Sequence, residues 1–281
     1  MRERTLTMRS ALRLMLPLLL MLVIVPVRAQ SEAPPVNWNT LLRAAGVNDV
    51  LDQADGMIQQ EIANLQNAPL GFNKQELAQL RQQFKVRLGS AQLKKAVLAS
   101  LQRRMSPEQA RQLVLVLQSP HYRFLHSLQT RLANPDVRED MRSYKVQVKE
   151  NAPNPGRVSL LSNLDASLEQ SSLEAELKVA LRKQLLITVS EIKTRETYSD
   201  AMLDQQLAGY RQEVSDTISQ NALYAYLYLF KHTPSSQVQD LVTSLQEPSY
   251  EQFMKVCREA IHSSFQLARQ QLRQDLRVAV K

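Results

Sequence analysis

The sequence has 281 residues but only one cysteine (Cys257), six glycines and 5% aromatic residues. A single cysteine excludes an intrachain disulfide, and there is no paired-cysteine set to hold a structural metal. The chain contains neither a glycine-rich phosphate loop nor a Gly-x-Ser-x-Gly motif. No alternating apolar and polar run bounded by turn signals predicts a strand. The fold must therefore be stabilised by an apolar core built from helices.

The residues that are abundant favour helices. Leu, Gln, Ala, Arg and Glu all have high helix propensity, and they dominate the chain. We therefore predict an all-α fold class. A first helix is expected over about 40–66, with a break near Gly46. Asn73 and Ser106 each stand three residues before a Glu or Gln, the spacing of a capping box at a helix start. A long amphipathic helix is expected over about 164–192.

One stretch occurs twice, at 109–122 and 237–250, with a constant offset of 128 positions. Such a repeat is typical of one helical unit used twice. In the first copy the predicted buried stripe is Ala110, Leu113, Val114 and Leu117. The second copy has Glu247 where the first has Ser119, so Pro248 is expected to kink a longer helix there. The residues that recur are Gln109, Leu113, Val114, Leu117, Gln118, Pro120 and Tyr122, matched by Gln237, Leu241, Val242, Leu245, Gln246, Pro248 and Tyr250.

The strongest boundary signal is the cluster of two prolines and a glycine within 151–156. It predicts two tandem helical units, each of roughly four to five amphipathic helices. We place the first unit at 40–134, a connector at 135–158 and the second unit at 159–281. Residues 30–39 are expected to form a flexible lead-in.

Residues 1–29 have the three parts of a secretory signal peptide: a basic start, an apolar core and a small-residue end. Cleavage is predicted between Ala29 and Gln30, which places the mature protein in the periplasm of a Gram-negative bacterium. The mature chain then carries 30 basic and 26 acidic side chains, net +4. The basic excess lies in 33–134, where 12 basic and 6 acidic side chains give net +6.

The candidate binding residues are aromatic. Within 222–230 the sequence is almost wholly apolar, and Tyr224 and Tyr228 share one helix face. Core packing between helices is one interpretation of this cluster. The other is an apolar groove with hydroxyl groups that binds a lipid, a peptide or a partner helix. The candidate set for partner or lipid binding is Tyr122, Phe124, Tyr224, Tyr228 and Tyr250.

No residue pattern predicts catalysis or cofactor binding. His121 and His126 are five positions apart, which is about 140° around a helix, so they cannot share a metal within one helix. We therefore predict no catalytic residue, no metal and no cofactor. Nucleic acid is a poor candidate partner because the chain is predicted to be exported and its mature charge is modest.

Ser106-Pro107-Glu108 precedes the first copy of the repeat, and Ser119-Pro120 stands before the aromatic Phe124. With the predicted signal peptide, this pattern resembles a bacterial envelope family recorded only as a domain of unknown function, whose members are small, exported and helical. Members of that family usually have one such unit, whereas this chain has two. The resemblance implies a location and a fold, and it brings no catalytic residues. It rests on Ser106, Pro107, Glu108, Leu113, Leu117, Ser119, Pro120 and Phe124.

Three functional hypotheses follow. The leading hypothesis is an exported, non-enzymatic envelope protein that binds a protein or envelope component through an apolar groove between helices. The second is a peripheral membrane or lipid-binding protein that uses the basic first half. The third is an unrecognised hydrolase. The partner would be an envelope protein or a lipid, and a homodimer is a further candidate assembly.

Overall fold

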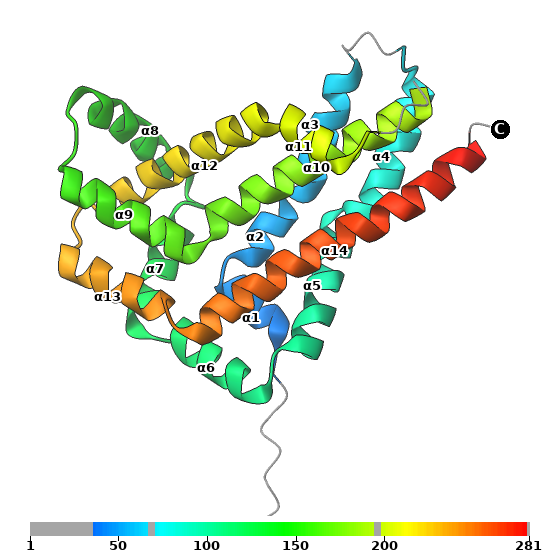
Figure 1. Ribbon diagram of the computed structural model, residues 1–281. Coiled ribbons are helices and arrows are strands. Elements are labelled where there is room, and N and C mark those ends of the chain that lie inside the picture. Colours follow the sequence, from blue (N-terminus) through cyan, green and yellow to red (C-terminus); the bar gives the residue numbers. More distant parts are fainter. Residues whose placement is uncertain (1–35, 67–70, 194–197, 280–281) are drawn as a thin grey trace, which may run out of the picture. The chain divides into compact units, whose positions relative to one another are not determined.

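The structure is a computed structural model that describes residues 36–66, 71–193 and 198–279. Every regular element in these ranges is an α-helix, which confirms the predicted all-α fold class. Residues 37–281 form one compact unit (Figure 1). The predicted signal peptide and the cleavage pair Ala29–Gln30 lie outside the described residues.

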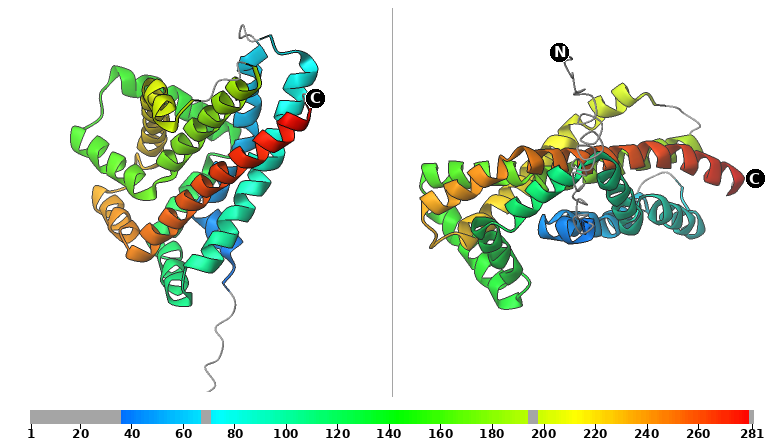
Figure 2. Two further views of the ribbon diagram at one scale, coloured as in Figure 1. Left: turned by 45° about the vertical axis from the view of Figure 1, so that its right-hand side comes forward. Right: turned by 90° about the horizontal axis from the view of Figure 1, so that it is seen from below.

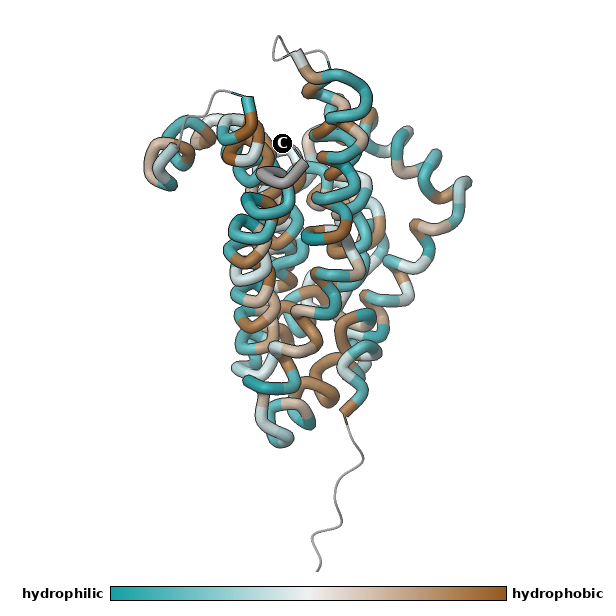
Figure 3. The backbone as a smooth tube through the Cα atoms, turned by 90° about the vertical axis from the view of Figure 1, so that its right-hand side faces the viewer, coloured by the Kyte–Doolittle hydropathy of each residue, from teal (hydrophilic) through white to brown (hydrophobic). Residues whose placement is uncertain are grey.

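The helices follow one another through short connections. Those of the first half are α1 Trp38–Ala44, α2 Val47–Asp52, α3 Ala54–Gln66, α4 Lys74–Leu88, α5 Ser90–Arg104, α6 Pro107–Leu117 and α7 Pro120–Arg131. Those of the second half are α8 Pro135–Glu150, α9 Pro155–Leu168, α10 Gln170–Lys193, α11 Asp200–Gln206, α12 Ala208–Leu229, α13 Ser235–Leu245 and α14 Pro248–Ala279. Hydrophilic and hydrophobic segments alternate along the chain (Figure 3), as expected for amphipathic helices.

Both predicted capping boxes are confirmed. The Asn73 side chain accepts from the Glu76 backbone amide at 2.9 Å, and the Glu76 carboxylate accepts from the Asn73 amide at 2.8 Å. Ser106 and Gln109 make the same reciprocal pair at 3.2 and 2.8 Å. These caps satisfy backbone amides that have no partner in the first turn, which is why α4 and α6 begin at these residues.

The structure differs from the sequence-based predictions, or adds detail to them, at four places. In α6 the buried stripe uses Val116, whereas Val114 is only half-buried. Pro248 does not kink a longer helix, because α13 ends at Leu245 and α14 begins at Pro248. The long helix expected over 164–192 is instead broken at Glu169, whose φ of 56° no α-helix accommodates. Most of the connector placed at 135–158 is helical, because α8 spans Pro135–Glu150.

Helices from the two predicted units, 40–134 and 159–281, pack against each other. The 32-residue α14 runs along both α4 and α5, and α10 contacts α2 and α3 as well as α12 (Figure 1 and Figure 2). The helices of the repeat also exchange neighbours: α6 contacts α14, and α13 contacts α7. In each copy of the repeat the first helix (α6 or α13) is followed by a second (α7 or α14). The first helix of each copy therefore packs on the second helix of the other copy.

The two repeated tyrosines meet in the core. The rings of Tyr122 and Tyr250 are fully buried, with centroids 6.5 Å apart. The Tyr122 hydroxyl donates to the carbonyl oxygen of Ala44 at 3.0 Å, and the Tyr250 hydroxyl donates to that of Leu168 at 3.1 Å. Each acceptor is the last residue of a helix, so each hydroxyl satisfies a carbonyl at a helix end.

Each of these helix ends is followed by a residue in the left-handed conformation. Gly46 has φ of 70° and follows α1, and Glu169 has φ of 56° and follows α9. The side-chain amide of Gln170 donates to the Ala45 carbonyl at 2.8 Å and so ties the two breaks together. A Cβ on residue 46 would lie 2.5 Å from Gln170 Nε2 and would displace that side chain, and the φ of 70° also favours glycine there.

We expect Tyr250→Phe to lower the free energy of unfolding by about 1–3 kcal/mol, because the buried Leu168 carbonyl loses its donor while the ring still packs. Urea denaturation followed by circular dichroism measures the change. Tyr224→Phe is the control, since the Tyr224 hydroxyl makes no hydrogen bond with any described residue. Equal effects from the two variants would contradict a role for the buried hydroxyl.

Candidate functional site

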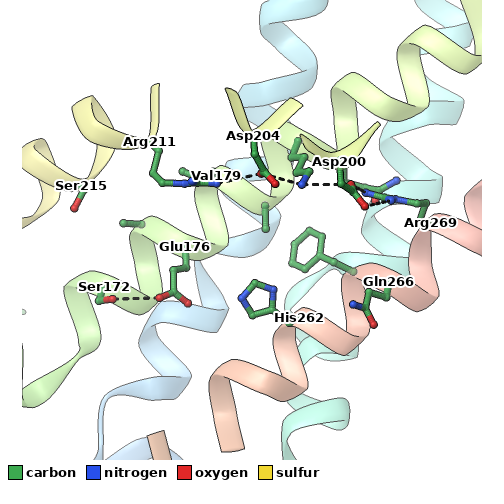
Figure 4. A pocket seen from close by; sticks show the side chains of 15 residues that line it. Ser172, Glu176, Val179, Asp200, Asp204, Arg211, Ser215, His262, Gln266 and Arg269 are labelled. Carbon is green, nitrogen blue, oxygen red and sulfur yellow. Dashed lines mark hydrogen bonds and ion pairs between the residues drawn. The ribbon is translucent and has the colours of Figure 1, made fainter. Parts of the chain in front are cut away.

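A cleft of about 720 Å³ opens between α10, α11, α12 and α14 (Figure 4). All of its lining residues come from the second half of the chain, which therefore builds this site from four helix faces. The lining residues are Ser172, Ala175, Glu176, Val179, Ala180, Lys183, Gln184, Asp200, Asp204, Arg211, Ser215, His262, Phe265, Gln266 and Arg269.

Helical spacing brings these side chains together. Along α10 the lining residues recur every three or four positions from 172 to 184, which keeps them on one face. The same spacing along α14 places residues 262, 265, 266 and 269 on one face. The floor between these faces is apolar. Ala175 and Val179 belong to a buried cluster with Val214 of α12, and Phe265 is 8% exposed.

Ion pairs hold α11 across one side of the cleft. The Asp200 carboxylate accepts two hydrogen bonds from the Arg269 guanidinium, at 2.7 and 3.1 Å. The Lys183 ammonium lies 3.3 Å from Asp200 and 2.9 Å from Asp204. Arg211 adds a contact of 3.3 Å to Asp204. One short helix is thus attached through two carboxylates to cations from α10, α12 and α14.

These cations fix the charge of both carboxylates. The Arg269 guanidinium, followed by Lys183, lowers the pKa of Asp200 to about 2. Lys183 is the main cause of a lowered pKa at Asp204. Both groups are therefore anions at neutral pH, so neither supplies the proton that a general acid must give. Their spacing of four is visible in the sequence, but their partners on three other helices are not.

Other polar side chains in the cleft have no partner among the described residues. Ser215, His262 and Gln266 line the cleft and make no hydrogen bond with the described part of the chain. His262 and Gln266 are exposed, and His262 projects from α14 into the space facing α10 (Figure 4). By contrast, Glu176 is paired with Arg258 at 3.2 Å. The cleft thus combines an apolar floor with hydrogen-bonding groups that are free to meet a ligand.

None of the five aromatic candidates lines this cleft. Tyr122 and Tyr250 are the buried central pair described above. Phe124 is half-buried and meets Phe230, the residue that follows α12, edge-on, with centroids 6.2 Å apart. These three side chains are occupied by packing within the core, and a binding role for them stays a prediction.

Tyr224 and Tyr228 lie beneath α8. Tyr228 is 6% exposed and packs against Tyr144 of α8, with centroids 5.7 Å apart. The Lys145 ammonium lies 4.8 Å from the centre of the Tyr224 ring. Since α8 has no buried residue, these contacts with α12 are its main attachment. Both rings therefore face α8, and a binding role for them stays a prediction.

In residues 36–66, 71–193 and 198–279, no three His, Cys, Asp or Glu side chains lie close enough to form a metal site. Cys257 is fully buried, and burial raises the pKa of its thiol. Within the same ranges, no helix has both the length and the apolarity needed to cross a membrane.

Comparison with known proteins gives no relatives for this chain. No protein-family model matches the sequence, and neither a curated protein nor a solved structure matches it significantly.

We expect Lys183→Met to loosen α11 without unfolding the rest of the protein, because it removes the cation that Asp200 and Asp204 share. Exposed ion pairs contribute up to about 1 kcal/mol, so amide exchange within 200–206 should accelerate about fivefold. Hydrogen–deuterium exchange measures this. Lys255→Met, which removes an exposed lysine on α14, is the control and should leave α11 unchanged.

The attachment of α11 should also weaken in acid. The pKa of Asp200 is about 2 in the folded protein, below its ordinary value of 3.8, so its stabilising effect is complete above about pH 4. The effect is lost as the pH falls from about 4 to about 2. Asp200→Asn should therefore speed exchange in α11 at pH 6 but match the wild type near pH 2. A constant difference between the two proteins across this range would contradict the assignment.

Proposed function

We propose that this protein is an exported, non-enzymatic helical protein of the cell envelope that binds a segment of a partner protein in the cleft between α10, α11, α12 and α14. The observation that carries the proposal is the combination of an apolar floor with unpartnered polar side chains in one cleft. Export is proposed from the signal-peptide pattern of residues 1–29.

The size and floor of the cleft suit a ligand with apolar side chains. Ligand-binding pockets are typically about 300–1,000 Å³ and mostly apolar, with a few convergent polar groups. The cleft of about 720 Å³ falls within that range. Val179 and Phe265 offer an apolar surface that is already held in place by packing between α10, α12 and α14. Little has to move for a side chain to bind there.

The free polar groups favour a peptide over an acyl chain. A peptide segment carries an amide donor and acceptor at almost every residue, and these need partners when they leave water. Ser215, His262 and Gln266 can supply such partners. An acyl chain has no polar group along its length, so it would leave all three side chains unused and partly desolvated. A segment with both apolar side chains and accessible amides matches the cleft better.

The charges of the cleft indicate a partner segment with little net charge. Three cationic side chains (Lys183, Arg211 and Arg269) balance three carboxylates (Glu176, Asp200 and Asp204), and all six are paired within the protein. A strongly charged ligand would have to break these ion pairs, and it could provide a new partner for the cations or for the carboxylates but not for both. An amphipathic, nearly neutral segment would leave them intact.

We also propose that the helical unit arose as two tandem units, 40–134 and 159–281, as the repeat suggests. The support is the reciprocal packing of α6 on α14 and of α13 on α7, with the repeated Tyr122 and Tyr250 in contact at the centre. An internal duplication is expected to fold in this way, with matching helices of the two copies in reciprocal contact around the point where the repeated tyrosines meet.

A photo-crosslinking amino acid at Gln266 tests the binding proposal directly. In an envelope extract it should crosslink to one defined peptide segment, identified by mass spectrometry, and the synthetic peptide should bind the protein in a calorimeter. The matched control places the crosslinker at Gln274, an exposed position of α14 that does not line the cleft. Crosslinking to a lipid, or equal yields at both positions, would contradict the proposal.

We expect Ala180→Phe to abolish this crosslinking and to weaken binding of the synthetic peptide at least about tenfold, because the larger side chain occupies the cleft. The residue lies at the edge of open space, so the free energy of unfolding should change by less than about 1 kcal/mol. Circular dichroism during urea denaturation checks the fold. Unchanged peptide binding in a folded variant would place the binding site elsewhere.

A further inference from the structure

The consecutive helices α4 and α5 carry an unusual concentration of positive charge. From Lys74 to Arg104, 31 residues include eight Lys or Arg side chains and one carboxylate, Glu76. The chain passes from α4 to α5 through Gly89 alone, so the charges follow one nearly continuous helical segment. At 1.5 Å per residue, that segment has a contour length of about 45 Å.

Three of these cations are neutralised by the rest of the fold. Arg87 pairs with Asp275 of α14 at 2.8 Å, and Lys94 pairs with Asp52 of α2 at 2.6 Å. Arg104 pairs with Glu259 of α14. The single carboxylate of the segment, Glu76, is itself paired with Lys193 at 2.7 Å. These pairs attach the segment to neighbouring helices. Because each pair joins one cation to one carboxylate, the pairs add no net charge to the surface.

The other five cations have no carboxylate within ion-pair distance among the described residues, and all five are exposed. We call them the α4–α5 basic strip. Nothing on α4 or α5 offsets their charge, so the strip forms a local excess of positive potential on a protein whose mature charge is only +4. The strip consists of Lys74, Arg81, Lys85, Lys95 and Arg103.

The strip points away from the cleft. On α4, Lys74, Arg81 and Lys85 are spaced by seven and four residues and lie within about 40° of one helix face. Arg87, on another face, reaches α14. On α14 itself the residues that contact Arg87 (271 and 275) lie on the opposite side from those that line the cleft (262, 265, 266 and 269), and no residue of the strip lines the cleft. Strip and cleft are therefore separate surfaces.

The chemistry of the strip fits an extended anionic surface. Lys74, Arg81 and Lys85 follow one face of α4, and all five charges are spread along the two helices, as contact with an extended surface requires. Each Lys or Arg close to an anionic bilayer strengthens binding by about fivefold, and the effect falls off within a Debye length.

We propose that the α4–α5 basic strip docks the helical unit on the surface of a bilayer that contains anionic lipids. The attachment is peripheral and electrostatic. It leaves the cleft on the far side of α14 open to a partner. This inference does not depend on the proposed partner of the cleft, and either can fail without the other.

Co-sedimentation with vesicles tests the proposal, using residues 37–281 so that the predicted signal peptide does not contribute. At low salt the protein should bind vesicles of phosphatidylcholine containing about one third phosphatidylglycerol, and it should not bind phosphatidylcholine alone. Binding should fall steeply as ionic strength rises from about 0.05 to about 0.5 M. Absence of binding to the anionic vesicles at low salt would overturn the proposal.

Matched charge variants locate the surface. The triple variant Arg81→Gln/Lys85→Gln/Lys95→Gln should lose at least about tenfold in vesicle affinity, whereas Arg81→Lys should retain it. The control, Arg123→Gln/Arg131→Gln/Lys149→Gln, removes the same charge from exposed unpaired residues elsewhere and should change affinity less than about threefold. Circular dichroism confirms that each variant is folded. Equal losses in both triple variants, or binding to soluble polyglutamate but not to vesicles, would overturn the docking assignment.

Discussion

Two tyrosine hydroxyls set the geometry on which the other features depend. Tyr122 and Tyr250 each satisfy the last carbonyl of a helix, at points where the chain turns through a left-handed residue. The Leu168 carbonyl is buried, so it needs the Tyr250 hydroxyl as its donor, and the Ala44 carbonyl is partly buried. Tyr250 stands in the first turn of α14, so its bond to Leu168 fixes the start of that helix against the junction of α9 and α10.

The position of α14 then separates the two candidate surfaces. One side of α14 pairs with Arg87 of the α4–α5 segment, and the other side faces α10 across the cleft. Charge is distributed unequally between them. In the cleft, cations and carboxylates balance and are bound to one another, whereas the strip carries cations with no partner. A balanced cleft favours a nearly neutral ligand, and an unbalanced strip favours an anionic surface, so the two proposals assign different partners to different faces.

Local features were predictable because they depend on neighbours in sequence. The capping boxes at Asn73 and Ser106 use residues three positions apart, and the break at Gly46 follows from a residue that tolerates positive φ. The break at Glu169 was missed, since glutamate rarely adopts that conformation and is held there by surrounding contacts, including its ion pair with Arg258. Likewise, whether Val114 or Val116 is buried in α6 depends on which helices cover it.

The all-helical class, the principal helix starts, the repeated stretch and the basic excess of the first half can all be read from the sequence, because propensity, capping and composition act over a few residues. Asp200 and Asp204 are four positions apart in the sequence, which puts them on one face once both lie in a helix. Their pairing with Lys183, Arg211 and Arg269 depends on how the helices pack, and so does the contact between Tyr122 and Tyr250 in the core. The physical reason is that burial and ion pairing depend on helices brought together from positions far apart in the chain, and no short-range pattern encodes which faces will meet.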